Sequence, residues 1–140
     1  MNRQHIAAII LTIAISAGLL VPAAMAQKVP YDQLMKGIQN TFTSLGKNID
    51  ASATAAVATD AAKLEALFKD TEAFWMPFKT KDALDSAKAG REAAAAVAAA
   101  ARDNDLAKAK TSYTAIGRTC GGCHGSHRDQ MPDKTFRIKP

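Results

Sequence analysis

The stretch KDALDSAKAGREAAAAVAAAAR, residues 81–102, decides the fold class. Alanine recurs throughout it, and alanine is the strongest helix former, with a side chain small enough to let helices approach closely. The positions expected to face a core follow helical spacing, at Leu84, Ala87, Ala94, Val97 and Ala101. The stretch therefore predicts one helix over residues 81–102 with one face turned inward.

Three further segments after Gln27 place apolar residues at spacings of three and four. They predict helices over residues 31–49, 54–74 and 106–128. Pro77 cannot donate a backbone hydrogen bond and disfavours a helical residue before it, so the second helix should stop close to it. The inward positions are Leu34, Met35, Ile38, Phe42, Leu45 and Ile49 in the first helix, Val57, Ala61, Leu64, Leu67 and Phe68 in the second, and Leu106, Ala109, Tyr113, Ile116, Cys120, Cys123 and His124 in the last.

Four amphipathic helices joined by short connections favour an all-α antiparallel four-helix bundle. The connection Asp103-Asn104-Asp105 separates the last two helices. No stretch of four or more residues after Gln27 alternates between apolar and polar side chains as a half-buried strand would. Residues 129–140, which include Pro132 and Pro140, are predicted to form an irregular tail.

The first 26 residues have the features of a secretory signal peptide. Arg3 supplies a positive start, an apolar run from Ile6 to Leu20 follows, and Ala24-Met25-Ala26 offers small residues at the cleavage site. An uncleaved membrane anchor is the alternative, but the run is too short and Pro22 interrupts its end. We therefore expect residues 1–26 to be removed, residues 27–140 to form one domain, and the mature protein to lie in the periplasm.

The charge of the mature chain excludes some classes of partner. Removing Arg3 with the leader leaves 17 of the 18 basic residues against 13 acidic ones, a net charge of +4. This mild excess, without a dense Lys/Arg patch interleaved with aromatic residues, argues against nucleic-acid binding. After the leader no segment is long and apolar enough to insert stably into a membrane.

The motif Cys120-Gly121-Gly122-Cys123-His124 carries the chemistry. C-x-x-C-H is the attachment motif of c-type haem. Two thiols at this spacing can form thioethers with the two vinyl groups on one edge of the porphyrin, while the histidine ligates the iron. On a helix the positions i, i+3 and i+4 share one face, so all three side chains converge on one ligand. The sequence predicts one covalent haem c with its iron. The predicted export agrees with this, because c-type haem is attached outside the cytoplasm.

Three other interpretations of the motif are weaker. A thioredoxin-like redox pair belongs to a βαβ unit, and no strand is predicted here. A zinc site would need Cys120, Cys123, His124 and His127, and one helix face cannot surround a tetrahedral ion with all four. A simple disulfide leaves the adjacent histidine unexplained.

The position of the motif constrains the second iron ligand. Met131 lies only seven residues after His124, on or just beyond the same helix, so it should not reach the opposite haem face. Any second protein ligand must come from upstream. Met76, beside Trp75 and Pro77, is expected to pack within a loop, whereas Trp75, Phe68 and Phe74 are expected to pack the bundle or the haem pocket.

A bundle with C-x-x-C-H in its last helix resembles the class II cytochromes c, the cytochrome c-prime family, over essentially the whole mature chain. The segment CGGCHGSHR places an arginine, Arg128, four residues after His124, as the family pattern does. The resemblance implies that Arg128 pairs with a haem propionate. His127 departs from the Tyr or Phe usual at its position; a surface or propionate role is expected for it rather than a metal role.

The first predicted helix is similar to the distal helix of that family, on the residues QLMK at 33–36, Phe42 and Leu45-Gly46. In the high-spin, ligand-sensing branch, a non-ligating bulky residue covers the open iron face. Here Met35 holds that position, which resembles the low-spin, methionine-ligated branch. A methionine in an apolar stripe is otherwise core filling. Tyr31 stands near a place where the family usually has arginine.

The resemblance implies a periplasmic electron carrier with His124 and Met35 as axial ligands. The alternative is a high-spin protein that binds or scavenges nitric oxide or carbon monoxide, with Met35 only shielding the iron. A third is an assembly or storage module whose haem is structural. No proton-transfer constellation indicates an enzyme.

Basic residues gather near the haem-bearing end, at Arg118, Arg128, Lys134, Arg137 and Lys139. They are either a solvated surface or a docking patch for an acidic redox partner protein. The resemblance also implies a homodimer, formed through the first two helices, as one option.

Overall fold

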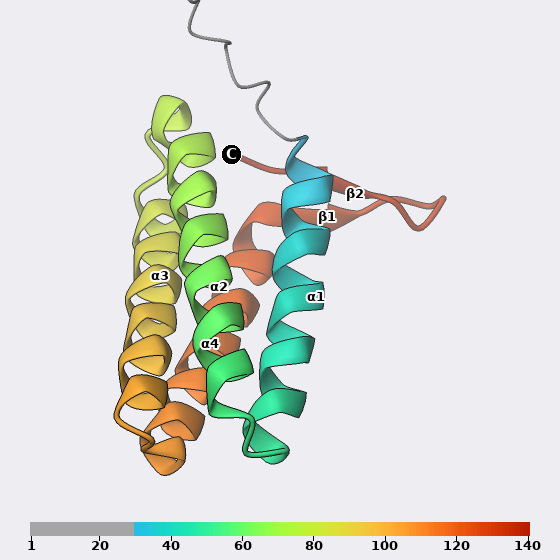
Figure 1. Ribbon diagram of the computed structural model, residues 1–140. Coiled ribbons are helices and arrows are strands. Elements are labelled where there is room, and N and C mark those ends of the chain that lie inside the picture. The colour runs from blue at the N-terminus through green and yellow to red at the C-terminus, as the bar shows by residue number, and fades with distance from the viewer. Residues whose placement is uncertain (1–29) are drawn as a thin grey trace, which may run out of the picture.

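The computed structural model describes residues 30–140. Four helices run antiparallel in sequence order, α1 (Tyr31–Asp50), α2 (Thr54–Trp75), α3 (Lys81–Arg102) and α4 (Leu106–His127). Figure 1 shows them side by side as one bundle. The predicted all-α four-helix bundle is confirmed. The predicted signal peptide lies outside the described residues.

The breaks between helices have local causes. α2 ends at Trp75 and gives way to the short 3₁₀ turn η1 (Met76–Phe78), with Pro77 inside it. Ser52, Lys79 and Asn104, one in each connection, adopt the left-handed conformation that ends a helix. Asp105 caps α4, because its carboxylate accepts a hydrogen bond of 2.9 Å from the backbone N–H of Lys108.

The core lies on the inner faces of all four helices. Leu45, Val57, Leu64, Val97 and Ile116 are fully buried. The alanine-rich face of α3 lets this helix approach closely, and a Cβ atom built on Gly90 would lie 2.6 Å from the ring of Phe68 on α2. The close approach makes α3 the helix around which α2 and α4 pack.

The seam between α1 and α4 is the loosest of the four. In the half of the seam nearer the α1–α2 and α3–α4 connections, the rings of Phe42 and Tyr113 stack with centroids 4.3 Å apart. Nearby, a Cβ atom on Gly46 would meet the Tyr113 hydroxyl at 2.6 Å, so the two helices touch closely there. Toward the other end of the seam α1 and α4 leave room for the cavity described below.

The C-terminal segment is a β-hairpin, so the prediction of an irregular tail at residues 129–140 was wrong. Strand β1 (Arg128–Gln130) continues directly from α4 and pairs antiparallel with β2 (Phe136–Ile138). Figure 1 shows the hairpin projecting sideways from the bundle beyond α1. It folds although it contains Pro132, because the proline lies in the turn and not in a strand.

Two further findings concern surfaces. Met76 is 64% exposed, so the expectation that it packs within a loop was wrong: it belongs to η1 and points to solvent. Among residues 30–140, no helix is both long and apolar enough to cross a membrane.

Candidate functional site

A cavity of about 560 Å³ opens between α1 and α4, with α2 and α3 behind it and the hairpin at one side. Its volume lies within the range of small-molecule and cofactor sites, about 300–1,000 Å³. The lining is mainly apolar and aromatic with a few polar groups, which is typical of such sites. The residues used below are Tyr31, Met35, Phe68, Trp75, Cys120, Cys123, His124, His127, Arg128 and Phe136.

The motif residues lie on one face of α4, as their spacing predicts. Cys120, Cys123 and His124 are half-buried and all three line the cavity. The thiol of Cys120 donates a hydrogen bond of 3.4 Å to the carbonyl of Ile116, one turn earlier. A side chain added at Gly121 or Gly122 would meet nothing within 4 Å, so no protein contact requires glycine between the cysteines.

The electrostatics of the thiols argue against a redox-active pair. Burial is the main cause that raises the pKa of both Cys120 and Cys123 above the ordinary value of 9.0. Reactive C-x-x-C thiols have a lowered pKa, because their chemistry needs the thiolate. These two cysteines are also not joined to each other. The thioredoxin-like interpretation therefore loses support.

His124 has the protonation state of a metal ligand. Burial, with a smaller effect from the positive charge of Arg128, lowers the pKa of His124 below its ordinary value of 6.5. The imidazole is therefore neutral at pH 7, and a neutral ring nitrogen can donate its lone pair to a metal. Among residues 30–140, no group of three or more His, Cys, Asp or Glu side chains is placed to hold a metal ion.

Met35 lies on α1 and lines the same cavity as the α4 motif. Its side chain is half-buried and packs against the edge of the core. Phe42, two turns further along α1, also lines the cavity. The fold thus brings a thioether from the first helix to the cavity that holds two thiols and an imidazole from the last.

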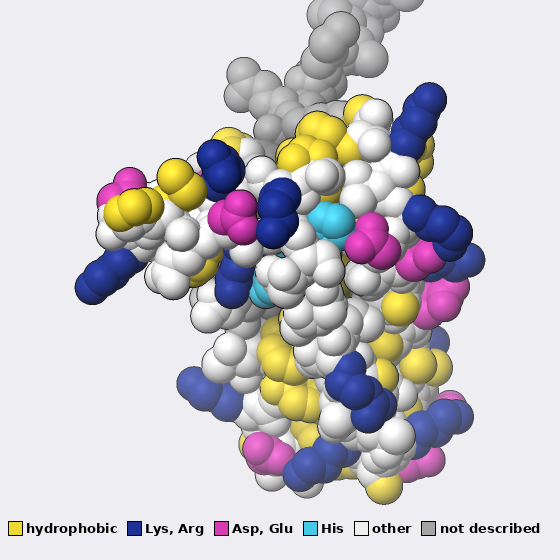
Figure 2. Space-filling view, turned by 180° about the vertical axis from the view of Figure 1, so that it is seen from behind, with side chains coloured by type: hydrophobic (Ala, Val, Ile, Leu, Met, Phe, Trp, Pro, Cys, Tyr) yellow, Lys and Arg dark blue, Asp and Glu magenta, His cyan; other side chains and the backbone are white. Residues whose placement is uncertain are grey.

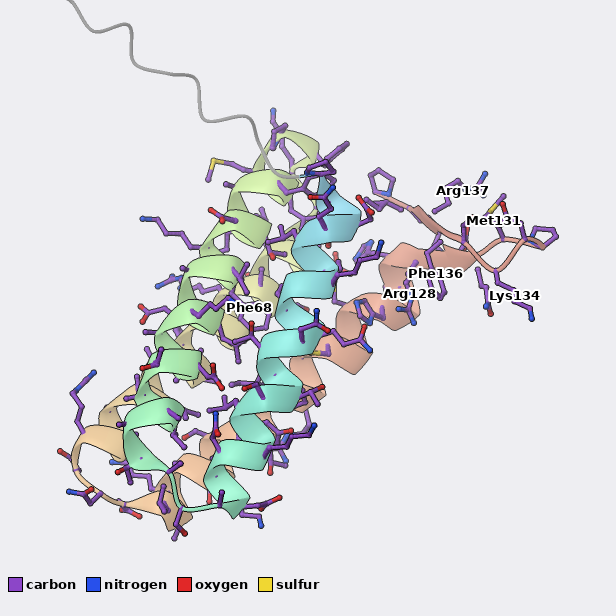
Figure 3. All side chains as sticks on the ribbon, turned by 45° about the vertical axis from the view of Figure 1, so that its right-hand side comes forward. Phe68, Arg128, Met131, Lys134, Phe136 and Arg137 are labelled. Carbon is purple, nitrogen blue, oxygen red and sulfur yellow. The ribbon has the colours of Figure 1, made fainter. Side chains whose placement is uncertain are left out.

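Arg128 stands at the mouth of the cavity, at the point where α4 becomes β1. Its guanidinium lies 4.2 Å from the centre of the Phe136 ring (Figure 3). No ion pair or side-chain hydrogen bond joins Arg128 to any residue of the described part of the chain.

His127 is not a surface residue, which corrects that expectation: its side chain is only 11% exposed. One ring nitrogen lies 2.9 Å from the carboxylate of Asp82 and the other 2.9 Å from the backbone carbonyl of Lys139. The ring also packs against Trp75, with centroids 5.1 Å apart. These contacts tie α4 to α3, to α2 and to Lys139, the residue that follows β2.

Sequence reasoning missed the role of Tyr31. Its hydroxyl accepts a hydrogen bond of 3.0 Å from the indole N–H of Trp75, and its ring stacks on Phe74 at 4.0 Å. Burial raises the pKa of Tyr31 to about 12, and it also lines the cavity. Aromatic residues gathered before Pro77 were the available signal. Trp75 and Phe68 are buried and line the cavity, as expected, whereas Phe74 is half-buried and stacks on Tyr31 beside it.

A scan against protein-family models gives no match to this chain, and searches of curated proteins and of solved structures give none either.

Proposed function

We propose that the chain is an exported one-haem c-type cytochrome that carries electrons. Cys120 and Cys123 would bind the haem covalently, and His124 and Met35 would be the axial ligands of its iron. The observation that carries the proposal is the shared cavity: the C-x-x-C-H face of α4 and the thioether of α1 line one largely apolar space.

The residues present fit such a group. The cavity is large, two unpaired thiols open into it, and burial keeps His124 neutral. The haem, when bound, supplies an iron that changes between the ferrous and ferric states. A histidine and a soft thioether together favour the ferrous state, so a comparatively high potential is expected.

The protein's contribution would be a fixed arrangement of ligands. α1 is held by its buried residues Leu34 and Ile38 on either side of Met35. α4 is held by Ile116 below the motif and by the His127 contacts just above it. Ligands held on two packed helices should move little when the charge on the iron changes.

The absorption spectrum of the ferric protein tests the ligand set. Low-spin, six-coordinate iron with a weak far-red sulfur-to-iron band supports Met35 ligation, and poor binding of carbon monoxide should accompany it. High-spin iron with ready gas binding would instead support the nitric oxide or carbon monoxide binding function, with Met35 as a shield.

Met35→Leu separates ligation from packing, because it nearly conserves volume and removes the sulfur. The variant should become high-spin, bind carbon monoxide readily and have a lower potential. Met76→Leu is the matched control, because Met76 is exposed and does not line the cavity. An unchanged spectrum in Met35→Leu would show that Met35 only packs against the core and does not bind the iron.

An acidic redox protein is the partner that the surface fits best. Figure 2 shows Lys and Arg side chains on and around the projecting hairpin, with acidic side chains among them. Asp129 pairs with both Arg137 and Lys139, which leaves Arg118, Arg128 and Lys134 outside the ion pairs within residues 30–140. Electron transfer to an anionic reagent such as ferricyanide should therefore slow as ionic strength rises, but only moderately.

A further inference from the structure

The two faces of the C-terminal hairpin differ in what they carry. Arg128 pairs with Ile138 in the ladder, and Gln130 pairs with Phe136. Since neighbouring residues of a strand point to opposite faces, these four side chains share one face. Arg128 and Phe136 are then diagonal neighbours, a separation that long and aromatic side chains can span. Arg128, Phe136 and Ile138 of this face line the cavity, and Arg137 of the other face also reaches its edge.

The other face holds its own charges. The carboxylate of Asp129 accepts hydrogen bonds from Lys139 at 3.1 Å and from Arg137 at 3.4 Å. These pairs lower the pKa of Asp129, the hydrogen bond from Lys139 contributing most. Asp129 is thus occupied on the far face, and it is not available to neutralise Arg128.

The guanidinium carbon of Arg128 lies over the face of the Phe136 ring, and this contact constrains the side chain without using any hydrogen-bond acceptor. The N–H groups of a guanidinium lie in its plane, so a ring against one surface leaves them able to donate. The described residues offer them no carboxylate partner. An arginine held in this way at the mouth of an apolar cavity is prepared to bind a carboxylate that arrives with the ligand.

We propose that Phe136 is a positioning residue that holds Arg128 at the cavity mouth to bind a carboxylate of the haem. The role of the hairpin is then to hold the side chain of this one arginine in place. The inference rests on the proposed function, and it adds a role for a residue twelve positions beyond the haem motif.

The end of the hairpin nearest the bundle is held to α4 by hydrogen bonds. The backbone N–H of Lys139 donates a hydrogen bond of 3.0 Å to the carbonyl of His127, whose ring in turn lies 2.9 Å from the Lys139 carbonyl. At the tip, the backbone N–H of Met131 donates to Thr135, and Lys134 adopts a left-handed conformation that closes the turn. Figure 3 shows Arg128 and Phe136 near the base and Met131 and Lys134 further out. The stack therefore lies in the anchored part of the hairpin.

A set of variants of the haem-loaded protein tests the proposal through the midpoint potential. A positive charge at the haem edge favours the reduced state, so Arg128→Gln should lower the potential. Phe136→Leu changes no charge, yet it should lower the potential in the same direction because Arg128 loses its support. The double variant should match Arg128→Gln alone, since Phe136 acts only through Arg128. Phe136→Tyr should restore the potential, because it keeps the ring.

Lys134→Gln is the matched control: it removes a positive charge from the same hairpin, at its tip, and should leave the potential nearly unchanged. A Phe136→Leu variant with wild-type potential would overturn the proposal, and so would additive shifts in the double variant or an equal shift in Lys134→Gln. If these variants carry covalent haem but show such results, only this inference fails. A wild-type protein without covalent haem would overturn it together with the proposed function.

Discussion

The imidazole of His127 lies 2.9 Å from the carboxylate of Asp82, a residue in the first turn of α3. The contact joins the last turn of α4 to the first turn of its neighbour α3, and the same ring reaches the carbonyl of Lys139 in the C-terminal segment. His127 is one turn beyond His124, so this bridge fixes the end of the helix that carries the haem motif.

His127→Phe should weaken this bridge while it keeps an aromatic ring against Trp75. The variant loses the ring N–H that donates to the Asp82 carboxylate or to the Lys139 carbonyl, so the free energy of unfolding should fall by about 1–3 kcal/mol. Urea unfolding measures the loss. Hydrogen exchange at the Lys139 amide, which donates to the His127 carbonyl, should quicken at the same time. Unchanged stability and exchange would show that the bridge contributes nothing.

The buried hydroxyl of Tyr31 predicts a sensitivity to alkaline pH. Burial raises its pKa from 10.0 to about 12 in the folded protein. The unfolded chain therefore releases this proton at lower pH than the folded protein does. The associated stability is fully present below pH 10 and is lost as pH rises through the folded pKa of about 12.

Tyr31→Phe separates the two effects of the hydroxyl. At neutral pH the variant should be less stable by about 1–3 kcal/mol, because the buried indole N–H of Trp75 loses its acceptor. Between pH 10 and 12 its stability should fall less steeply than that of the wild type. Unfolding free energies measured across this range check both, and parallel curves would refute the alkaline effect.

Two glycines on different helices should respond oppositely to alanine. A Cβ atom on Gly90 would lie 2.6–2.8 Å from the Phe68 ring, which lines the cavity, so Gly90→Ala should cost about 1–3 kcal/mol despite its better helix propensity. At Gly37 the nearest atom is a flexible Leu67 methyl at 3.5 Å, an ordinary contact. Gly37→Ala should therefore stabilise by up to about 1 kcal/mol. Thermal unfolding of both variants measures these changes in stability. If both variants lost the same amount of stability, the packing argument would be contradicted.

The helices could be predicted closely because their causes are local. Apolar spacing, Pro77 and the Asp103–Asp105 break place each helix end within one or two residues of where the structure has it. The motif face of α4 follows from the same periodicity. That Met35 lines the same cavity was expected from the family resemblance, since no local pattern pairs the first helix with the last.

The missed features depend on contacts between distant residues. The hairpin strands are only three residues long, and their turn places Lys134, not glycine, in the left-handed conformation, so the usual turn signal is missing. The position of His127 depends on Asp82, which a sequence pattern cannot pair with it. Met76 is exposed because η1 turns it outward, although its neighbour Trp75 is 1% exposed.

The mass of the intact mature protein tests the central claim most directly. The protein should be expressed with its own leader in cells that have haem-maturation machinery, purified from the periplasm and measured after denaturation. The account predicts a single species of residues 27–140 plus one haem, and a Cys120→Ser/Cys123→Ser variant of the same chain without that added mass. A folded wild-type protein with the mass of the bare polypeptide would contradict the account.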